Sequence, residues 1–206
     1  LFFYSSGLLM LANAMNYLLF KIDQVMIKHY LGESSLGLYS VAVKLSEVWY
    51  FIPAILCTSL FPAIINSKTT DEQLYRKRVL RLYGLLIIIA VSIAIPISLF
   101  SMQIVTLLYG LEYAASSNIL SLYIWSSIGL FLMTGINRKL IADNRLMSLF
   151  IYSVIAVGTN IALNMVWIPK FGASGAAWAT LVSYSISPII VYIVSLITYY
   201  GNKKIR

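Results

Sequence analysis

The chain has 206 residues, of which 60% are hydrophobic and only 11% are charged. A soluble domain carries roughly 25% charged residues, so this composition excludes an ordinary soluble protein and indicates an integral membrane protein. A net charge of +8 would suggest a nucleic-acid partner in a soluble protein. In a membrane protein it indicates basic cytoplasmic loops, and we expect no nucleic-acid binding.

Taken in chain order, six apolar segments are each long enough for a transmembrane helix of about 20 residues. Turn-forming sequences such as LGESSLG at 31–37 and PKFGASG at 169–175 separate them. The predicted spans are 1–30, 36–65, 82–100, 117–136, 146–168 and 175–200. The sequence therefore predicts an all-α polytopic membrane protein in which residues 1–206 form a single six-helix lobe.

Two connections carry further structural signals. Thr69 precedes Glu72 by three residues and Thr70 precedes Gln73 by three, and both pairs fit a capping box. We therefore expect the third helix to begin in water, before its membrane-spanning part. On the other side of the membrane, 101–116 is expected to form the longest loop.

The basic residues indicate an orientation. Eleven of the 15 lysines and arginines fall in segments 66–81 and 137–145 and in the C-terminal tail, which six spans place on one face. By the positive-inside rule this face is cytoplasmic, so we expect both ends of the chain in the cytoplasm. The chain begins without methionine and shows no signal peptide, and we expect it to be part of a longer protein.

Motifs of common enzyme sites are missing from the sequence, including H-E-x-x-H, Cys-x-x-Cys, a P-loop and G-x-S-x-G. We therefore expect no catalytic residue, metal or cofactor. Gly172 and Ala176, and likewise Gly175 and Ala179, are small residues four positions apart. Since they follow a membrane span, they favour close helix packing over a nucleotide-binding loop.

The first span carries polar residues on one face. On a helix with 100° per residue, Asn13, Asn16 and Asp23 fall within one narrow arc, and Lys21 lies at its edge. An ionised group at the bilayer centre costs about 2.5–3.5 kcal/mol on insertion scales. This stripe should therefore face protein or water instead of lipid.

Matching charges occur on the second span. If the first two spans fold back near residues 33–34, Asp23 lies level with Lys44, and Lys21 lies level with Glu47. Two interpretations stay open: the charges pair to fix helix register, or they line an aqueous cavity for a polar cargo.

A third polar stripe lies on the fifth span, where Asn160 and Asn164 share a face and helix packing is the favoured interpretation. The candidate residues of a substrate cavity are Lys21, Asp23, Lys44, Glu47, Asn13, Asn16, Asn160 and Asn164.

Four segments resemble the second half of polysaccharide flippases, in the expected order. They are KIDQVMIKHYLGESSLGLYSVAVKL at 21–45, IPAILCTSLFPAI at 52–64, IVTLLYGLEYAAS at 104–116 and PKFGASGAAWAT at 169–180. The family exports lipid-linked O-antigen or capsule repeat units, and its superfamily also contains multidrug exporters and flippases of peptidoglycan precursors.

The resemblance implies a two-lobe transporter of the bacterial inner membrane, of which this chain is the C-terminal lobe. Its cargo would be an oligosaccharide on undecaprenyl pyrophosphate, moved by alternating access. Its partners would be that lipid-linked oligosaccharide, membrane lipids, a missing N-terminal six-helix lobe and other polysaccharide assembly proteins. Lys21, Asp23 and Lys44 would occupy positions suited to the anionic headgroup.

Two alternative functions remain open at this point. A cation-coupled multidrug exporter of the same superfamily would favour acidic and aromatic cavity residues, whereas the charges predicted inside the membrane balance. A membrane-embedded sugar polymerase or ligase would normally have a large extracytoplasmic loop with Arg, His or Asp. The segment 101–116 offers only Glu112.

Overall fold

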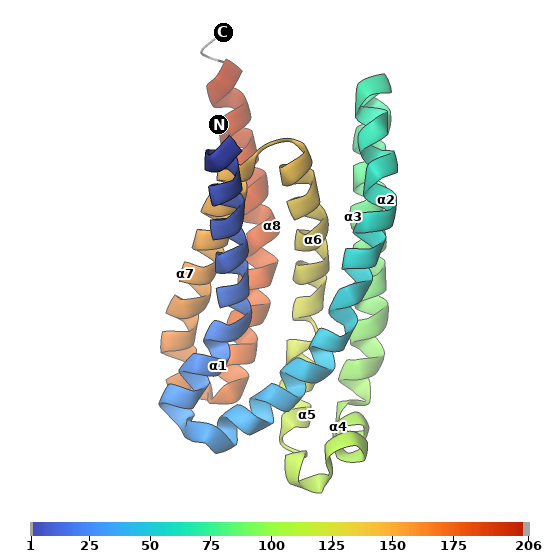
Figure 1. Ribbon diagram of the computed structural model, residues 1–206. Helices are drawn as coiled ribbons and strands as arrows, with labels where there is room; N and C mark the ends of the chain where they lie inside the picture. The colour runs from blue at the N-terminus through green and yellow to red at the C-terminus, as the bar shows by residue number, and fades with distance from the viewer. Residues whose placement is uncertain (1, 204–206) are drawn as a thin grey trace.

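The computed structural model describes the backbone of residues 2–203, with the side chains of residues 6–68 and 71–191. All regular structure in this part of the chain is helical. Five of its segments are long and apolar enough to cross a membrane, and the first, Ser6–Lys68, has 63 residues. That segment folds back on itself (Figure 1). The number of six passes stays a prediction from the sequence. The all-α polytopic class predicted from the sequence is confirmed.

The first hairpin is formed within α1 (Phe2–Glu47), which bends at Gly32. The backbone angles there are φ 81° and ψ −176°, a conformation that glycine adopts readily because it has no Cβ. The bend lies one residue before the turn predicted at 33–34. Beyond it the chain runs obliquely through η1 (Val48–Tyr50) into α2 (Phe51–Thr70), as Figure 1 shows.

The third pass is α3 (Glu72–Leu99), and its N-cap is Asp71. One carboxylate oxygen of Asp71 accepts hydrogen bonds from the backbone N–H groups of Gln73 and Leu74, at 2.8 and 3.2 Å. The capping boxes predicted from Thr69 and Thr70 were therefore wrong. Both threonines end α2, and an aspartate fills the N-cap position that a threonine was expected to take.

The expected loop at 101–116 is mostly helical. It contains α4 (Ser101–Tyr109) and η2 (Leu111–Tyr113), and α5 (Ser116–Tyr123) follows. The segment folds onto the bundle because α4 is two-sided: Val105 is fully buried, whereas Leu107 is 85% exposed. The expected loop thus contains a helix that was not predicted, because the amphipathic pattern of α4 was not recognised in the sequence.

The remaining passes are α5 with α6 (Ser126–Ala142), then α7 (Leu146–Phe171) and α8 (Ala173–Lys203). The first pass of α1 packs with α7 and α8, while α2 and α3 pack with α6. The two groups meet where α6 packs on α8. Gly129 allows this contact, since a Cβ there would lie 2.5 Å from the carbonyl oxygen of Tyr184.

Small residues also bring α7 and α8 together, as predicted. A Cβ at Gly175 would clash with the backbone of Trp167, and Ala176 and Ala179 are fully buried. Gly172 has a different role, because its φ of 64° makes it the turn between the two helices.

One end of the bundle, here called the basic end, carries the N-terminus, the C-terminal part of α8, and the α2–α3 and α6–α7 turns (Figure 1). Asp143 joins two of these segments, accepting from Lys68 at 2.6 Å and Lys139 at 3.0 Å. Burial raises the pKa of the Asp143 carboxyl, but the two lysines outweigh it and hold that pKa below its ordinary value. The predicted grouping of segments 66–81 and 137–145 on one face thus agrees with their positions; a cytoplasmic location of that face stays a prediction.

Candidate functional site: a polar cavity and a buried carboxylate

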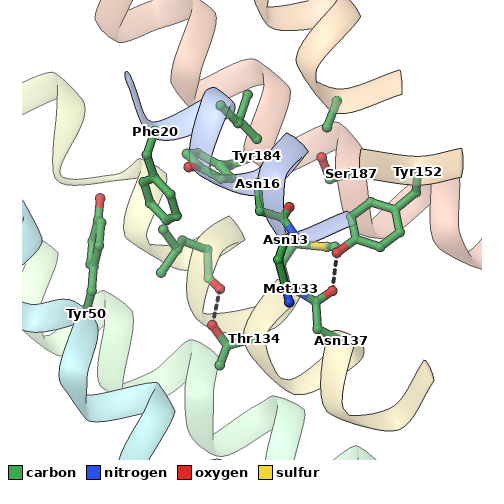
Figure 2. Close-up of a pocket in the computed structure, with 13 residues that line it drawn as sticks. Asn13, Asn16, Phe20, Tyr50, Met133, Thr134, Asn137, Tyr152, Tyr184 and Ser187 are labelled. Atoms are coloured by element: carbon green, nitrogen blue, oxygen red, sulfur yellow. Dashed lines mark hydrogen bonds between the residues drawn. The ribbon is translucent and has the colours of Figure 1, made fainter. Parts of the chain in front are cut away.

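A cavity of about 300 Å³ lies between the two helix groups. Side chains from α1, η1, α6, α7 and α8 surround it (Figure 2). Its polar lining consists of Asn13, Asn16, Thr134, Asn137, Tyr152 and Ser187, and its aromatic lining adds Phe20, Tyr50 and Tyr184. Acidic and basic residues are absent from the described lining, so the cavity is polar but uncharged.

Hydrogen bonds orient several of the lining groups. The Tyr152 hydroxyl donates to the side-chain oxygen of Asn137, which links α7 to α6 across the cavity (Figure 2). Ser153 donates to the side-chain oxygen of Asn16 at 3.4 Å, which links α7 to α1. The buried hydroxyl of Tyr184 bonds to no other side chain or backbone group in the described part of the chain. The cavity therefore has both fixed polar groups and free hydrogen-bonding capacity.

Asp23 is the centre of a separate buried cluster and is only 2% exposed. Its carboxylate accepts from the Tyr39 hydroxyl at 2.9 Å, from the Asn164 amide at 2.6 Å and from the Thr180 hydroxyl. Asn164 also donates to the side-chain oxygen of Asn160 at 2.9 Å. The bend of α1 places Asp23 opposite Tyr39, while α7 supplies both asparagines and α8 supplies the threonine.

The predicted pairing of Asp23 with Lys44 is wrong. Lys44 is exposed, and no ion pair joins Asp23 to a basic residue in the described part of the chain. The sequence showed only that the two residues lie at the same depth along their helices. It did not specify how each helix is rotated about its axis, and the rotation decides which side chains meet. Asp23 is turned toward α7 and α8, whereas Lys44 is turned away from the bundle.

The second predicted pair is present. Lys21 and Glu47 are joined by an ion pair of 3.6 Å, with their side chains 40% and 31% exposed. Because Lys44 lies three residues before Glu47 on the same helix, the two lysines and this carboxylate are grouped on a partly open surface.

The buried cluster has a definite chemical consequence. A carboxylate surrounded by three neutral donors and no cation is costly to hold ionised within a membrane. A proton on Asp23 neutralises it, and so does a small hard cation held by oxygen ligands. The side-chain oxygen of Asn164 is buried and accepts no hydrogen bond from the described residues, so it is available as a further oxygen ligand. Among the described residues there is no group of three or more His, Cys, Asp or Glu side chains of the kind that binds transition metals.

The structure thus divides the predicted site residues into three sets. Asn13 and Asn16 line the cavity, Asp23, Asn160 and Asn164 form the buried cluster, and Lys21, Lys44 and Glu47 lie on the open surface.

Several residues of both sites were missed in the sequence. Tyr39 belongs to an aromatic class that usually anchors membrane interfaces, and Thr180 follows a run of small packing residues. Asn137 is the first residue of the basic segment 137–145, which was assigned to a loop. The missed signal was the helical continuity of α6 through residue 142, which carries Asn137 inward.

Comparison with known proteins now adds to this geometry. The family described as "Polysaccharide biosynthesis protein" matches residues 1–118. The chain is 28% identical over 179 residues to "Probable flippase AglR" of Haloferax volcanii, and the match covers 82% of this chain and 36% of that protein. It is 25% identical over 172 residues to "Probable low-salt glycan biosynthesis flippase Agl15" of the same organism, again covering 82% and 36%.

The chain spans little more than a third of the length of these two relatives. Since the family match extends over more than half of the chain, its membership is clear. This helical, polytopic membrane protein belongs to the polysaccharide biosynthesis protein family.

Proposed function

We propose that the chain is one lobe of a membrane flippase that translocates a lipid-linked oligosaccharide. The observation that carries the proposal is the uncharged cavity, with its asparagines, hydroxyl groups and aromatic rings. The names of the two archaeal relatives support a flippase, and the second name also supports a role in glycan biosynthesis.

The lining chemistry suits the sugar portion of such a cargo. Asparagine amides such as Asn16 and Asn137 both donate and accept hydrogen bonds, and so do the hydroxyl groups of a sugar. Aromatic rings such as Phe20 and Tyr184 offer flat apolar faces, while the tyrosine hydroxyl offers a polar tip. An uncharged cavity suits a neutral sugar better than a phosphate, because a phosphate needs basic partners.

The anionic headgroup requires positive charge, and Lys21 and Lys44 are proposed to supply it. Their partly open position next to Glu47 leaves the trio with one net positive charge. A lysine can offset a phosphate charge without a fixed geometry, so it suits a moving headgroup. Glu47 would hold Lys21 when no cargo is present.

The proposal extends to the whole transporter. A second six-helix lobe would face this one and complete a central cavity, and alternating access would expose it to each side of the membrane. We propose a polyprenyl-pyrophosphate carrier such as undecaprenyl pyrophosphate, and an O-antigen or capsule type of repeat unit. The basic end would be cytoplasmic, in the plasma membrane of the cell.

A cation-coupled drug exporter is the second candidate function, and Asp23 is the observation that favours it. A buried carboxylate that gains and loses a proton or cation is a common coupling device in membrane transporters. The two functions differ in cargo, so a transport assay with a lipid-linked oligosaccharide and with a cationic drug distinguishes them.

The experiment measures surface glycan in cells that depend on the natural full-length protein. Alanine at Lys21, Lys44, Asn16 or Asn137 should lower export at unchanged protein level. Lys28→Ala is the matched control for the lysines, because Lys28 pairs with Glu33 at 3.0 Å near the α1 bend, away from both sites. Ser92→Ala is the control for the cavity, since exposed Ser92 bonds only to its own helix. Normal glycan in all four site variants would contradict the proposal.

A further inference from the structure

A second concave site lies between α2 and α3, beside the basic end. It is a groove of about 290 Å³. Its walls are formed by Leu60, Ile64, Leu82 and Leu85, and Arg78 and Arg81 also line it. Both helices contribute residues at helical spacing, so one face of each helix builds the site. Neither the polar cavity nor the Asp23 cluster shares a residue with this groove.

The apolar walls are partly uncovered. Leu60 is 40% exposed and Leu85 is 38% exposed, whereas Ile64 and Leu82 beneath them are buried. In a membrane such a surface contacts hydrocarbon chains. The groove therefore offers a partly exposed apolar surface that would face the lipid in a membrane.

The two arginines have unused hydrogen-bonding capacity. One nitrogen of Arg78 donates to the carbonyl oxygen of Ala63 at 2.9 Å, which holds the guanidinium over the groove and leaves its other N–H groups free of described partners. Arg81 makes no hydrogen bond or ion pair with any residue in the described ranges.

The nearby acidic side chains are already engaged. Glu72 pairs with Arg76 at 2.7 Å, Asp143 pairs with Lys68 and Lys139, and Asp71 caps α3. No acidic residue is among the described residues that line the groove. The arginine pair is therefore a site of positive charge without a described counter-charge, set beside an apolar surface.

We propose that this groove binds an anionic phospholipid of the membrane leaflet at the basic end. The phosphate would lie between Arg78 and Arg81, because guanidinium groups bind phosphate oxygens through paired N–H donors. One acyl chain would cover Leu60 and Leu85. Basic pockets between transmembrane helices bind anionic headgroups in this manner. A free phosphate would leave the exposed leucines uncovered, so the chemistry favours a lipid.

The test is native mass spectrometry on the natural full-length protein, purified in detergent and titrated with phosphatidylglycerol or phosphatidylcholine of identical acyl chains. Phosphatidylglycerol should be retained preferentially. Arg81→Gln should weaken its retention about fivefold, the factor expected for one basic residue next to an anionic lipid. Since Arg81 has no described partner, this variant should fold normally. Adding Arg78→Gln should weaken retention further.

Lys77→Gln is the matched control, because exposed Lys77 lies on the same turn of α3 but does not line the groove. An equal loss in Lys77→Gln would contradict the proposal and indicate diffuse attraction to the basic end. Equal retention of both lipids by the unchanged protein would also contradict it. If a polyprenyl phosphate displaces phosphatidylglycerol at equal concentration, the groove belongs to the glycan carrier and the assignment to a structural phospholipid is wrong.

Discussion

Replacing Asp23 with alanine should destabilise the bundle more than any other single change to a charged residue described here. The substitution removes the acceptor shared by the Tyr39 hydroxyl, the Asn164 amide and the Thr180 hydroxyl. All three donors are buried, with exposed fractions of 0–1%. They lie among α1, α7 and α8, so water cannot easily replace the missing carboxylate.

The magnitude follows from the number of donors. Leaving one buried group without its partner costs about 1–3 kcal/mol. The Thr180 hydroxyl can still donate to the carbonyl oxygen of Ala176 at 3.1 Å, so the other two donors imply a loss of at least about 2 kcal/mol in the free energy of unfolding. Asp23→Asn should cost less, because the amide keeps the shape and one acceptor oxygen. Glu47→Ala is the matched control: its half-exposed ion pair with Lys21 is worth less than about 1 kcal/mol.

The assay is reversible unfolding in mixed micelles, followed by circular dichroism at neutral pH. A double-mutant cycle of Asp23→Ala with Thr180→Val should show a coupling of about 0.5–3 kcal/mol, as expected for residues in one hydrogen-bond network. If Asp23→Ala stays within about 0.5 kcal/mol of the unchanged protein, as a typical surface substitution does, the buried cluster described here is wrong.

Three further predictions concern glycine positions and the basic end. Gly32→Ala should lower the free energy of unfolding by about 1–3 kcal/mol, because the φ of Gly32 is 81°. Gly37 has no positive φ and open space around it, so Gly37→Ala should be neutral or stabilising. Thermal unfolding of both variants measures the difference. Gly129→Ala should separate α6 from α8 and lower the melting temperature, because the new Cβ would meet the Tyr184 carbonyl. Gly84 has no such neighbour, so Gly84→Ala is the control. An equal fall in melting temperature for Gly84→Ala would contradict the explanation. Asp143→Asn should destabilise the protein at neutral pH. The folded-state pKa of Asp143 is lowered, so the loss of unfolding free energy caused by the substitution should be full above pH 3.8, the ordinary pKa of an aspartate. This loss should shrink as the pH falls below that value. A loss that grows in acid would contradict the expected pH dependence.

Composition and periodicity predicted the class because each helix that crosses a membrane must satisfy the same requirement for an apolar length. The charge pattern likewise predicted that residues 66–81 and 137–145 lie at one end, where Lys68 and Asp143 now meet. These properties depend on position along the membrane normal. They can be read from a sequence without knowing how any helix is rotated.

The candidate site depends on how each helix is rotated about its axis and on contacts between elements that are distant in sequence. Sequence reasoning predicted these features less well. Lys21 and Glu47 were paired correctly, but Asp23 is bound by Asn164 and Thr180 from helices more than a hundred residues away. No local pattern specifies such contacts. The cavity was predicted only in part for the same reason: Asn13 and Asn16 were among the candidate residues, but five elements contribute to the lining.

The most direct test of the central claim is to capture the sugar inside the cavity. Phe20 lines the cavity and can be replaced with the photoreactive analogue p-benzoylphenylalanine at small cost in shape. Ile88 on α3, which is 67% exposed and outside the cavity, provides the control position. Illumination of membranes that contain a lipid-linked oligosaccharide labelled in its sugar should attach the label at position 20 and not at position 88. Label at position 88 alone, or equal label at both positions in a protein that still transports, would contradict the account.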